Sequence, residues 1–107
     1  MVSQGDIICL DLDPQAGHEQ KGRRPALVIS NNSFNRYSSM YMICPITNID
    51  KKHAFHIPLD DKTKTNGVIL CDQARILDIK VRNYEFVERL PQNILEKAKN
   101  LLIGFIE

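Results

Sequence analysis

The sequence has almost no net charge, because 14 lysines and arginines are balanced by 13 aspartates and glutamates. This balance excludes a protein that coats nucleic acid through an overall positive charge, and a nucleic-acid binder of this composition needs local basic patches. The sequence also lacks a long apolar run, and no basic start leads into an apolar segment. We therefore expect no membrane span and no signal peptide.

Cysteine is scarce and odd in number. Cys9, Cys44 and Cys71 lie in separate apolar stretches. This arrangement argues against a disulfide framework and predicts reduced, mostly buried thiols in a cytoplasmic protein.

Motifs for several common catalytic sites are missing. Gly17 and Gly22 have the spacing that opens a P-loop, but two arginines follow them and lead into a strand-like run. No paired cysteines are present, and His53 and His56 would point to opposite faces of a strand, which argues against zinc. A hydrolase elbow of the Gly-x-Ser-x-Gly type is also absent. We expect neither a metal nor a cofactor.

With 107 residues, the chain is expected to form a single domain over residues 1–107. A domain of this size has no second lobe, so its site must lie on a face, in a groove or at a subunit boundary. Short apolar runs, some of them alternating, predict seven strands. These are Asp6–Leu12, Ala26–Ser30, Met40–Pro45, Phe55–Leu59, Val68–Asp72, Ala74–Ile79 and Glu85–Leu90.

One substantial helix is predicted, at the C-terminal end. Pro91 suits a first helical turn, and apolar residues then recur at helical spacing. This stripe consists of Ile94, Leu95, Ala98, Leu101, Leu102, Phe105 and Ile106. Asn31–Ser39 is predicted as a loop with one helical turn around Phe34. The pattern predicts a mainly β (α+β) protein, a small curved sheet or partial barrel with a C-terminal helix and one or two short helices.

Side chains with useful chemistry gather in two segments that border the predicted strands. A polar loop ends at Pro25, and it carries His18, Glu19, Gln20, Lys21, Arg23 and Arg24. The second segment, Cys44-Pro45-Ile46-Thr47-Asn48, places a hydroxyl and an amide after an apolar run. Loops held by rigid strands are where binding and catalysis concentrate.

These segments resemble the signature of the MazF/PemK toxin family of toxin–antitoxin systems. The family pattern has a Gly-Asp-Ile start, a Glu-Gln-x-Gly-x-Arg-Pro loop and a Pro-Ile-Thr element. Gly5-Asp6-Ile7, Glu19–Pro25 and Pro45–Thr47 reproduce it in order. The run Val68-Ile69-Leu70, with Asp72-Gln73 and Arg75, fits the middle region of the family.

The resemblance implies an SH3-like (PemK-like) barrel and a sequence-specific, metal-independent endoribonuclease that cuts single-stranded RNA, including mRNA. It implies attack by the 2′-hydroxyl, which leaves 2′,3′-cyclic phosphate and 5′-hydroxyl ends. It further implies a cytoplasmic homodimer that is neutralised by an antitoxin of the MazE type. The alternative is a toxin similar to CcdB, which has no nuclease activity and poisons DNA gyrase. A barrel that only binds nucleic acid or peptide ranks last.

Arg24 and Thr47 are the first catalytic candidates. Pro25 restricts the backbone before it, and a guanidinium on a restricted backbone suits bidentate binding of phosphate oxygens. The resemblance makes Arg24 the catalytic arginine, Arg23 a supporting cation that contacts substrate, and Thr47 the threonine of the site. From residue type alone, a solvated surface pair is the favoured interpretation of the two arginines, and a residue that caps a turn is a common role for Thr47.

The general acid and base are left open. Histidine is the natural choice from its pKa, but the family often has serine at the position of His18, so we assign His18 to substrate contact. Glu19 matches a family position and is the better candidate for a base or for a group that orients Arg24. An ion pair between Glu19 and Lys21 or Arg24 is the equal alternative.

Three amide side chains are candidates for reading bases in single-stranded RNA: Gln20, Asn48 and Gln73. Hydrogen bonds within loops are at least as good an explanation for each of them. Phe34 and Tyr37 are candidates for stacking on bases, although filling the core is the better prediction for Phe34. The cleavage motif itself does not follow from the sequence.

Overall fold

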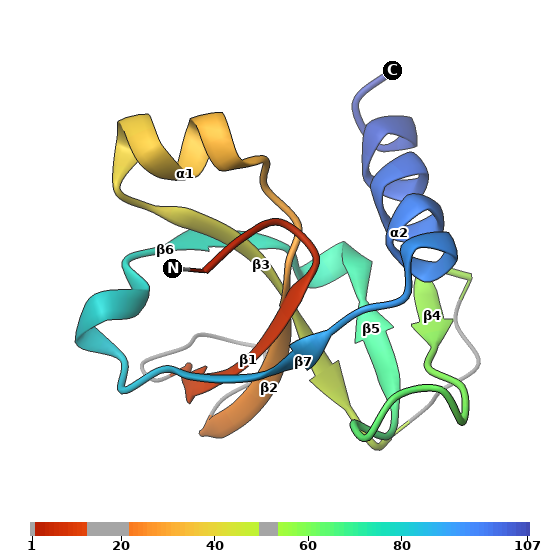
Figure 1. Cartoon of the computed structure of the whole chain (residues 1–107). Helices are drawn as coiled ribbons and strands as arrows, with labels where there is room; N and C mark the ends of the chain where they lie inside the picture. Colours follow the sequence, from red (N-terminus) through yellow and green to blue (C-terminus); the bar gives the residue numbers. More distant parts are fainter. Residues whose placement is uncertain (1, 13–21, 50–53) are drawn as a thin grey trace.

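The computed structural model describes residues 2–12, 22–49 and 54–107 (Figure 1). Seven strands form one antiparallel sheet in the order β4-β5-β3-β2-β1-β7, with β6 paired to β3 beside β5. The strands are β1 (Asp6–Asp11), β2 (Arg23–Val28), β3 (Tyr41–Thr47), β4 (His56–Pro58), β5 (Val68–Leu70), β6 (Arg75–Leu77) and β7 (Glu85–Arg89). The helices are α1 (Asn32–Ser38) and α2 (Gln92–Gly104), and the 3-10 turns are η1 (Cys71–Gln73) and η2 (Ile79–Val81). Over the described residues the sheet stays open, with β4 and β7 at its two ends.

The predicted fold class, mainly β with a C-terminal helix, is confirmed. The long strand β3 shows how the sheet curves, because its two halves pair with different strands. Its first half pairs with β6, as in Tyr41 with Leu77, and its last residues pair with β5, as in Ile46 with Ile69. Pro45 was predicted to close this strand, and that boundary is wrong because the strand continues to Thr47. Pro45 lies between the two ladders, where its missing N–H breaks no bond to either partner.

Two apolar cores lie on opposite faces of β1, β2 and β3, because successive side chains of a strand alternate. The core that includes α2 is formed by Ile7, Leu27, Ile29, Cys44, Ile46, Ile69, Cys71, Leu90, Ile94, Leu95 and Ala98. The other core is formed by Val2, Ile8, Leu10, Leu12, Ala26, Val28, Ile43, Leu77 and Ile79. The pairing of β1 with β7 contains a bulge, since Ile7 pairs with Glu88 and Ile8 with Phe86, which leaves Val87 of β7 unpaired in this ladder. The three cysteines are free, and Cys44 and Cys71 are buried, as predicted.

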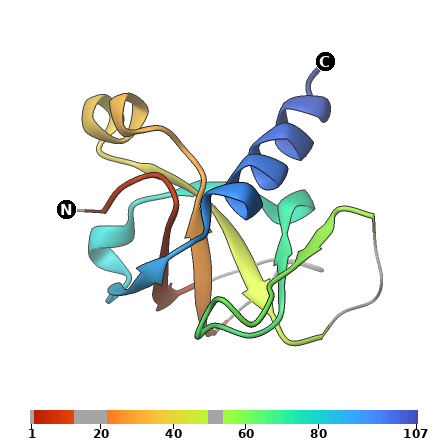
Figure 2. The same cartoon turned by 45° about the vertical axis from the view of Figure 1, so that its right-hand side comes forward.

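Helix α2 confirms the predicted C-terminal helix. Its first turns bury Ile94, Leu95 and Ala98 against the sheet. The stripe then runs past the core, since Phe105 and Ile106 are exposed. In both views α2 and α1 stand apart above the sheet (Figures 1 and 2). No helix within the described ranges is long and apolar enough to cross a membrane.

Helix α1 is longer than the single turn that the sequence predicts. The Asn31 side chain caps it by accepting a hydrogen bond from the Phe34 amide at 2.7 Å. Buried Asn35 anchors the helix to the sheet through the Ser30 hydroxyl. Polar contacts of this kind leave no apolar stripe in the sequence, so periodicity misses the helix. The prediction that Phe34 fills the core is also wrong, because this side chain is 36% exposed.

Candidate active site

The ends of β2 and β3 bring Arg24 and Thr47 to one face of the sheet. Arg24 pairs with Leu10 of β1. The ladder between β2 and β3 last pairs Ala26 with Pro45. Because side chains alternate along a strand, Arg24 and Thr47, each two residues beyond this pair, share its face of the sheet. The two predicted catalytic residues therefore lie on one face at adjoining strand ends, although Arg24 lies within β2 and not on a loop.

Thr47 has a fixed position and is only 3% exposed. Its backbone pairs with Val68, and its Oγ1 accepts a hydrogen bond from the Ile49 amide at 3.2 Å. An oxygen that accepts in this way can direct its own proton outward as a donor. Gly67 lies directly against this strand end, and a Cβ there would be 2.2 Å from the Thr47 carbonyl oxygen. Since Gly67 also has φ +118°, only glycine fits beside Thr47.

Arg23 points to the opposite side of β2 and is held by acidic and carbonyl groups. Its Nη1 lies 3.2 Å from Asp11 Oδ1 and donates to the Asn83 carbonyl at 2.8 Å. Its Nη2 lies 2.7 Å from Glu85 Oε1. Hydrogen bonds from Asn83 and Arg23 lower the pKa of Asp11 below its ordinary value. The structure thus ties Arg23 to β1 and β7 and does not bring it together with Arg24 and Thr47.

The remaining predicted residues fall into two groups. His18, Glu19 and Gln20 lie outside the described residues. Leu12 and Gly22, the described residues on either side of them, are joined by a hydrogen bond of 2.9 Å from the Leu12 amide to the Gly22 carbonyl. Among the described candidates, Asn48 follows Thr47 directly and is exposed. Gln73 lies on η1, past the end of β5 that is distant from Thr47, because β5 runs antiparallel to β3.

Two further side chains reach this face that the sequence did not single out. Arg75 pairs with Ile43, and its Nη2 donates to the Leu12 carbonyl at 3.0 Å, at the base of the polar loop. Pairing with Leu70 places His56 on the same face of β4 and β5 as Val68, the partner of Thr47. Their positions depend on strand pairing across the sheet; the resemblance included Arg75 without giving it a role, and no signal in the sequence assigned His56 to this face.

His56 is paired with one acidic side chain. Its Nε2 lies 3.6 Å from Asp72 Oδ1, and its side chain is 10% exposed. Across residues 2–12, 22–49 and 54–107, no three His, Cys, Asp or Glu side chains gather as a metal site would require.

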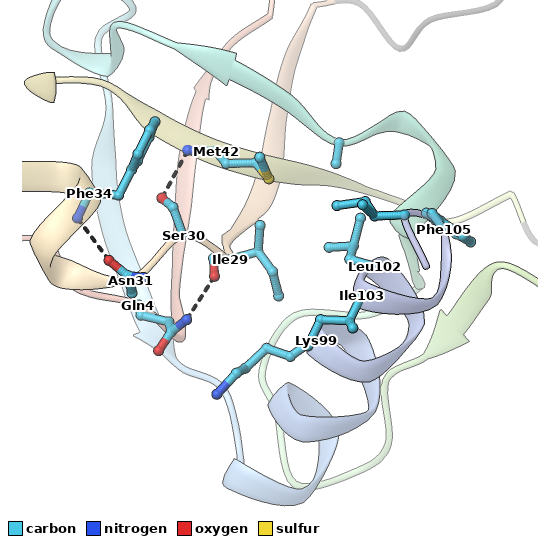
Figure 3. A pocket seen from close by; sticks show the side chains of 12 residues that line it. Gln4, Ile29, Ser30, Asn31, Phe34, Met42, Lys99, Leu102, Ile103 and Phe105 are labelled. Atoms are coloured by element: carbon cyan, nitrogen blue, oxygen red, sulfur yellow. Dashed lines mark hydrogen bonds between the residues drawn. The ribbon is translucent and has the colours of Figure 1, made fainter.

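A separate hollow of about 440 Å³ lies near the start of β3, away from Thr47. Figure 3 shows Phe34 and Met42 on one side of it, and Leu102 and Ile103 of α2 with the following Phe105 on the other. Its lining is mostly apolar. It therefore has the character of a surface for packing, whereas the Arg24 face has the character of a site for phosphate.

A guanidinium and a hydroxyl on one face of a small curved sheet are groups of the kind that can bind an anion such as phosphate. The chain belongs to the family described as PemK-like, MazF-like toxin of type II toxin–antitoxin system, which matches residues 3–106. This membership confirms the resemblance found in the sequence.

The chain is similar to several named proteins over nearly its full length. It is 37% identical to endoribonuclease PemK of Escherichia coli, over 91% of this chain and 76% of that protein. It is 35% identical to endoribonuclease toxin MazF of Escherichia coli (strain K12), over 94% and 92%. Among solved structures, MazF of Deinococcus radiodurans matches with a TM-score of 0.91 and 34% identity, over 98% of this chain and 96% of that one. A MazE–MazF complex from the same organism matches with a TM-score of 0.85, 34% identity and coverage of 98% and 95%.

Proposed function

We propose that this chain is a sequence-specific endoribonuclease that cuts single-stranded RNA, and that it is the toxin of a toxin–antitoxin pair. The observation that carries the proposal is that Arg24 and Thr47 share one face of the sheet, at the adjoining ends of β2 and β3. Its relatives are named endoribonucleases, and the chain retains the groups that RNA cleavage needs. A toxin that only poisons gyrase has no use for a guanidinium and a hydroxyl directed at one phosphate.

In the proposed reaction, the 2′-hydroxyl of the RNA attacks the adjacent phosphorus and expels the 5′-oxygen. The products are a 2′,3′-cyclic phosphate and a 5′-hydroxyl end. Arg24 binds the phosphate oxygens and stabilises the negative charge that grows on them. The Thr47 hydroxyl donates to the same phosphate, with its oxygen held by the Ile49 amide. Arginine does not lose its proton in proteins, so proton transfer falls to other groups.

Three groups remain as candidates for that proton transfer. Glu19 and His18 come from the polar loop, as the sequence suggests. His56 is the third, because it faces the same side of the sheet and has Asp72 as a partner. A pH–rate profile distinguishes a histidine from a glutamate, since their ordinary pKa values are about 6.5 and about 4.3.

The decisive experiment is to incubate the purified protein with a defined single-stranded RNA and to map both new ends. Cyclic phosphate and 5′-hydroxyl ends, formed equally well in excess EDTA, are the expected result. Activity that EDTA abolishes and magnesium restores would contradict the metal-independent mechanism. Intact RNA together with inhibition of gyrase would replace the proposal by the alternative similar to CcdB. If the expected ends are found, primer extension along a long RNA will give the cleavage motif.

The proposal includes two partners. One is a second copy of the chain, since a small domain offers no deep cleft and a two-fold dimer supplies an extended groove for RNA. The exposed end of α2 and the apolar hollow beside it (Figure 3) are the surface that we assign to this contact. Light scattering at micromolar concentration tests it, and a monomer that cuts at full rate would contradict it. The other partner is an antitoxin of the MazE type, as in the solved MazE–MazF complexes.

A further inference from the structure

Glu88 lies on the edge strand β7, yet its carboxylate holds a loop that borders the candidate site. Oε1 accepts a hydrogen bond from the Lys64 amide at 3.0 Å, and Oε2 accepts one from the Thr65 amide at 2.8 Å. Oε2 also accepts the Thr65 hydroxyl at 2.8 Å. The loop connects β4 and β5, whereas β7 is at the other end of the open sheet. The Glu88 carboxylate thus bridges the two ends of the sheet.

The loop that Glu88 holds is ordered by its own hydrogen bonds. Asp60 Oδ1 accepts from the Lys62 amide at 2.9 Å, and the Thr63 hydroxyl donates to the Thr65 carbonyl at 2.7 Å. The base of the loop is closed by the Leu59 amide, which donates to the Gly67 carbonyl at 2.9 Å. Because the loop is compact without Glu88, the carboxylate fixes where the loop lies and not whether it forms.

The end of this loop touches the site directly. Gly67 is so close to β3 that a Cβ on it would lie 2.2 Å from the Thr47 oxygen and 3.2 Å from Asn48 Oδ1. The next residue, Val68, pairs with Thr47. Only one residue separates Thr65 from Gly67. A displacement of Thr65 is therefore transmitted over a very short, closely packed path to Thr47 and Asn48.

The charge state of Glu88 suits this role. Burial raises the pKa of Glu88, but the hydrogen bonds from Lys64 and Thr65 outweigh burial and bring the pKa below its ordinary value. The carboxylate is therefore ionised across the neutral range, and charge-assisted bonds to amides are stronger than neutral ones.

We propose that Glu88 is a positioning residue, which sets the place of Thr47 and Asn48 through the segment from Lys64 to Gly67 and thereby determines which nucleotide is accepted beside the cleaved phosphate. This inference rests on the proposed function. Glu88 itself touches no substrate. Its effect is on the geometry of Thr47 and on the amide of Asn48 that is exposed to a base.

The test compares Glu88→Gln and Thr65→Val with Glu96→Gln as the matched control. The Glu88→Gln substitution keeps the size of the side chain but offers one acceptor oxygen in place of two, whereas Thr65→Val removes only the hydroxyl bond. Glu96 lies on the exposed side of α2, where it binds Gln92 and Lys99. For each variant, kcat, KM and the distribution of cleavage sites on one long RNA are measured.

Glu88→Gln is expected to lower kcat/KM about tenfold, which is less than the roughly hundredfold cost of a 1 Å misplacement. It should also broaden the nucleotide preference at the cleavage site. Thr65→Val should show a smaller change in the same direction, and Glu96→Gln should match the wild type. A variant at position 88 that keeps the wild-type preference overturns the inference, even if its activity falls with its melting temperature.

A second readout separates this inference from the proposed function. If the wild type cuts no RNA, the proposed function fails, but the amide resonances of Thr47 and Asn48 still report their positions. Glu88→Gln should shift both resonances, and Glu96→Gln should leave them in place. Unchanged resonances in Glu88→Gln would overturn the positioning role independently of cleavage.

Discussion

Arg23 and Arg24 are consecutive residues of β2, but their side chains lie on opposite faces of the sheet. Arg23 faces Asp11 and Glu85, which bind its guanidinium, whereas Arg24 lies on the face of Thr47. Successive side chains of a strand point to opposite faces, which separates the two arginines. The neighbouring groups on each face then determine the role of each guanidinium. One arginine serves the fold and the other lies where the proposed chemistry takes place, although their residue type is identical.

The largest expected effect comes from Arg24→Ala. Removal of one donor that stabilises transition-state charge typically costs about a hundredfold to a thousandfold in rate. The fold should remain, because Arg24 belongs to neither apolar core. Cleavage rates and thermal unfolding measured on the same samples check this result. Equal and mild effects from Arg24→Ala and Arg23→Ala would remove the functional difference between the two faces.

Thr47→Ala should also impair cleavage, by about tenfold to a hundredfold, since it removes a neutral donor where Arg24 supplies a charged one. Thr47→Ser keeps the hydroxyl and the acceptor for the Ile49 amide, so it should retain a substantial part of the rate. The initial rates of the two variants on one RNA substrate are the measurement. If serine were as poor as alanine, the methyl group and not the hydroxyl would be what matters.

Arg23→Ala should act on stability more than on rate. The variant leaves Asp11 and Glu85 without their cation, so its melting temperature should fall slightly at low salt. The difference from the wild type should shrink at high salt, because exposed ion pairs are screened. Melting curves at two ionic strengths provide the check. A large loss of cleavage with normal melting would instead place Arg23 among the groups that bind RNA, as its position in the sequence first suggested.

The smallest effect concerns pH. The pKa values of Glu88 and Asp11 are lowered in the folded protein from ordinary values of 4.5 and 3.8. A lowered pKa contributes stability that is fully present above the ordinary value and is lost as pH falls through the folded value. Stability should therefore decline as pH drops below about 4.5. Melting temperatures from neutral pH to about pH 3 should show a shallower decline for Glu88→Gln, and an unchanged slope would contradict the assignment.

Much of the fold was predictable because strands and an amphipathic helix leave periodic apolar patterns. The stripe that begins at Ile94 specified α2, and alternation located the strands. The prolines made the predicted strand boundaries wrong. Pro25 was predicted to end a loop, but it lies inside β2, opposite Cys9, at a point before pairing with β3 begins. Helix α1 was underestimated because its determinants, Asn31 and Asn35, are polar.

The candidate site was only partly predictable, for a different reason. Chemistry and resemblance singled out Arg24 and Thr47, but their common face depends on the register between β2 and β3. His56 and Asp72 belong to different elements of the chain and meet only because β4 pairs with β5. Long-range pairing of this kind leaves no local mark in one sequence. The roles of His18, Glu19 and Gln20 stay predictions.

Pro45 separates the part of β3 that pairs with β6 from the part that pairs with β5. Because the residue offers no N–H between the β6 ladder and the β5 ladder, separation of β5 from β3 need not break a bond of the other ladder. The β4–β5 hairpin joins the central strands through two residue pairs, Ile46 with Ile69 and Thr47 with Val68. With so few pairs between them, the hairpin is held on β3 mainly by its buried side chains, since Ile69 is 0% and Leu70 2% exposed.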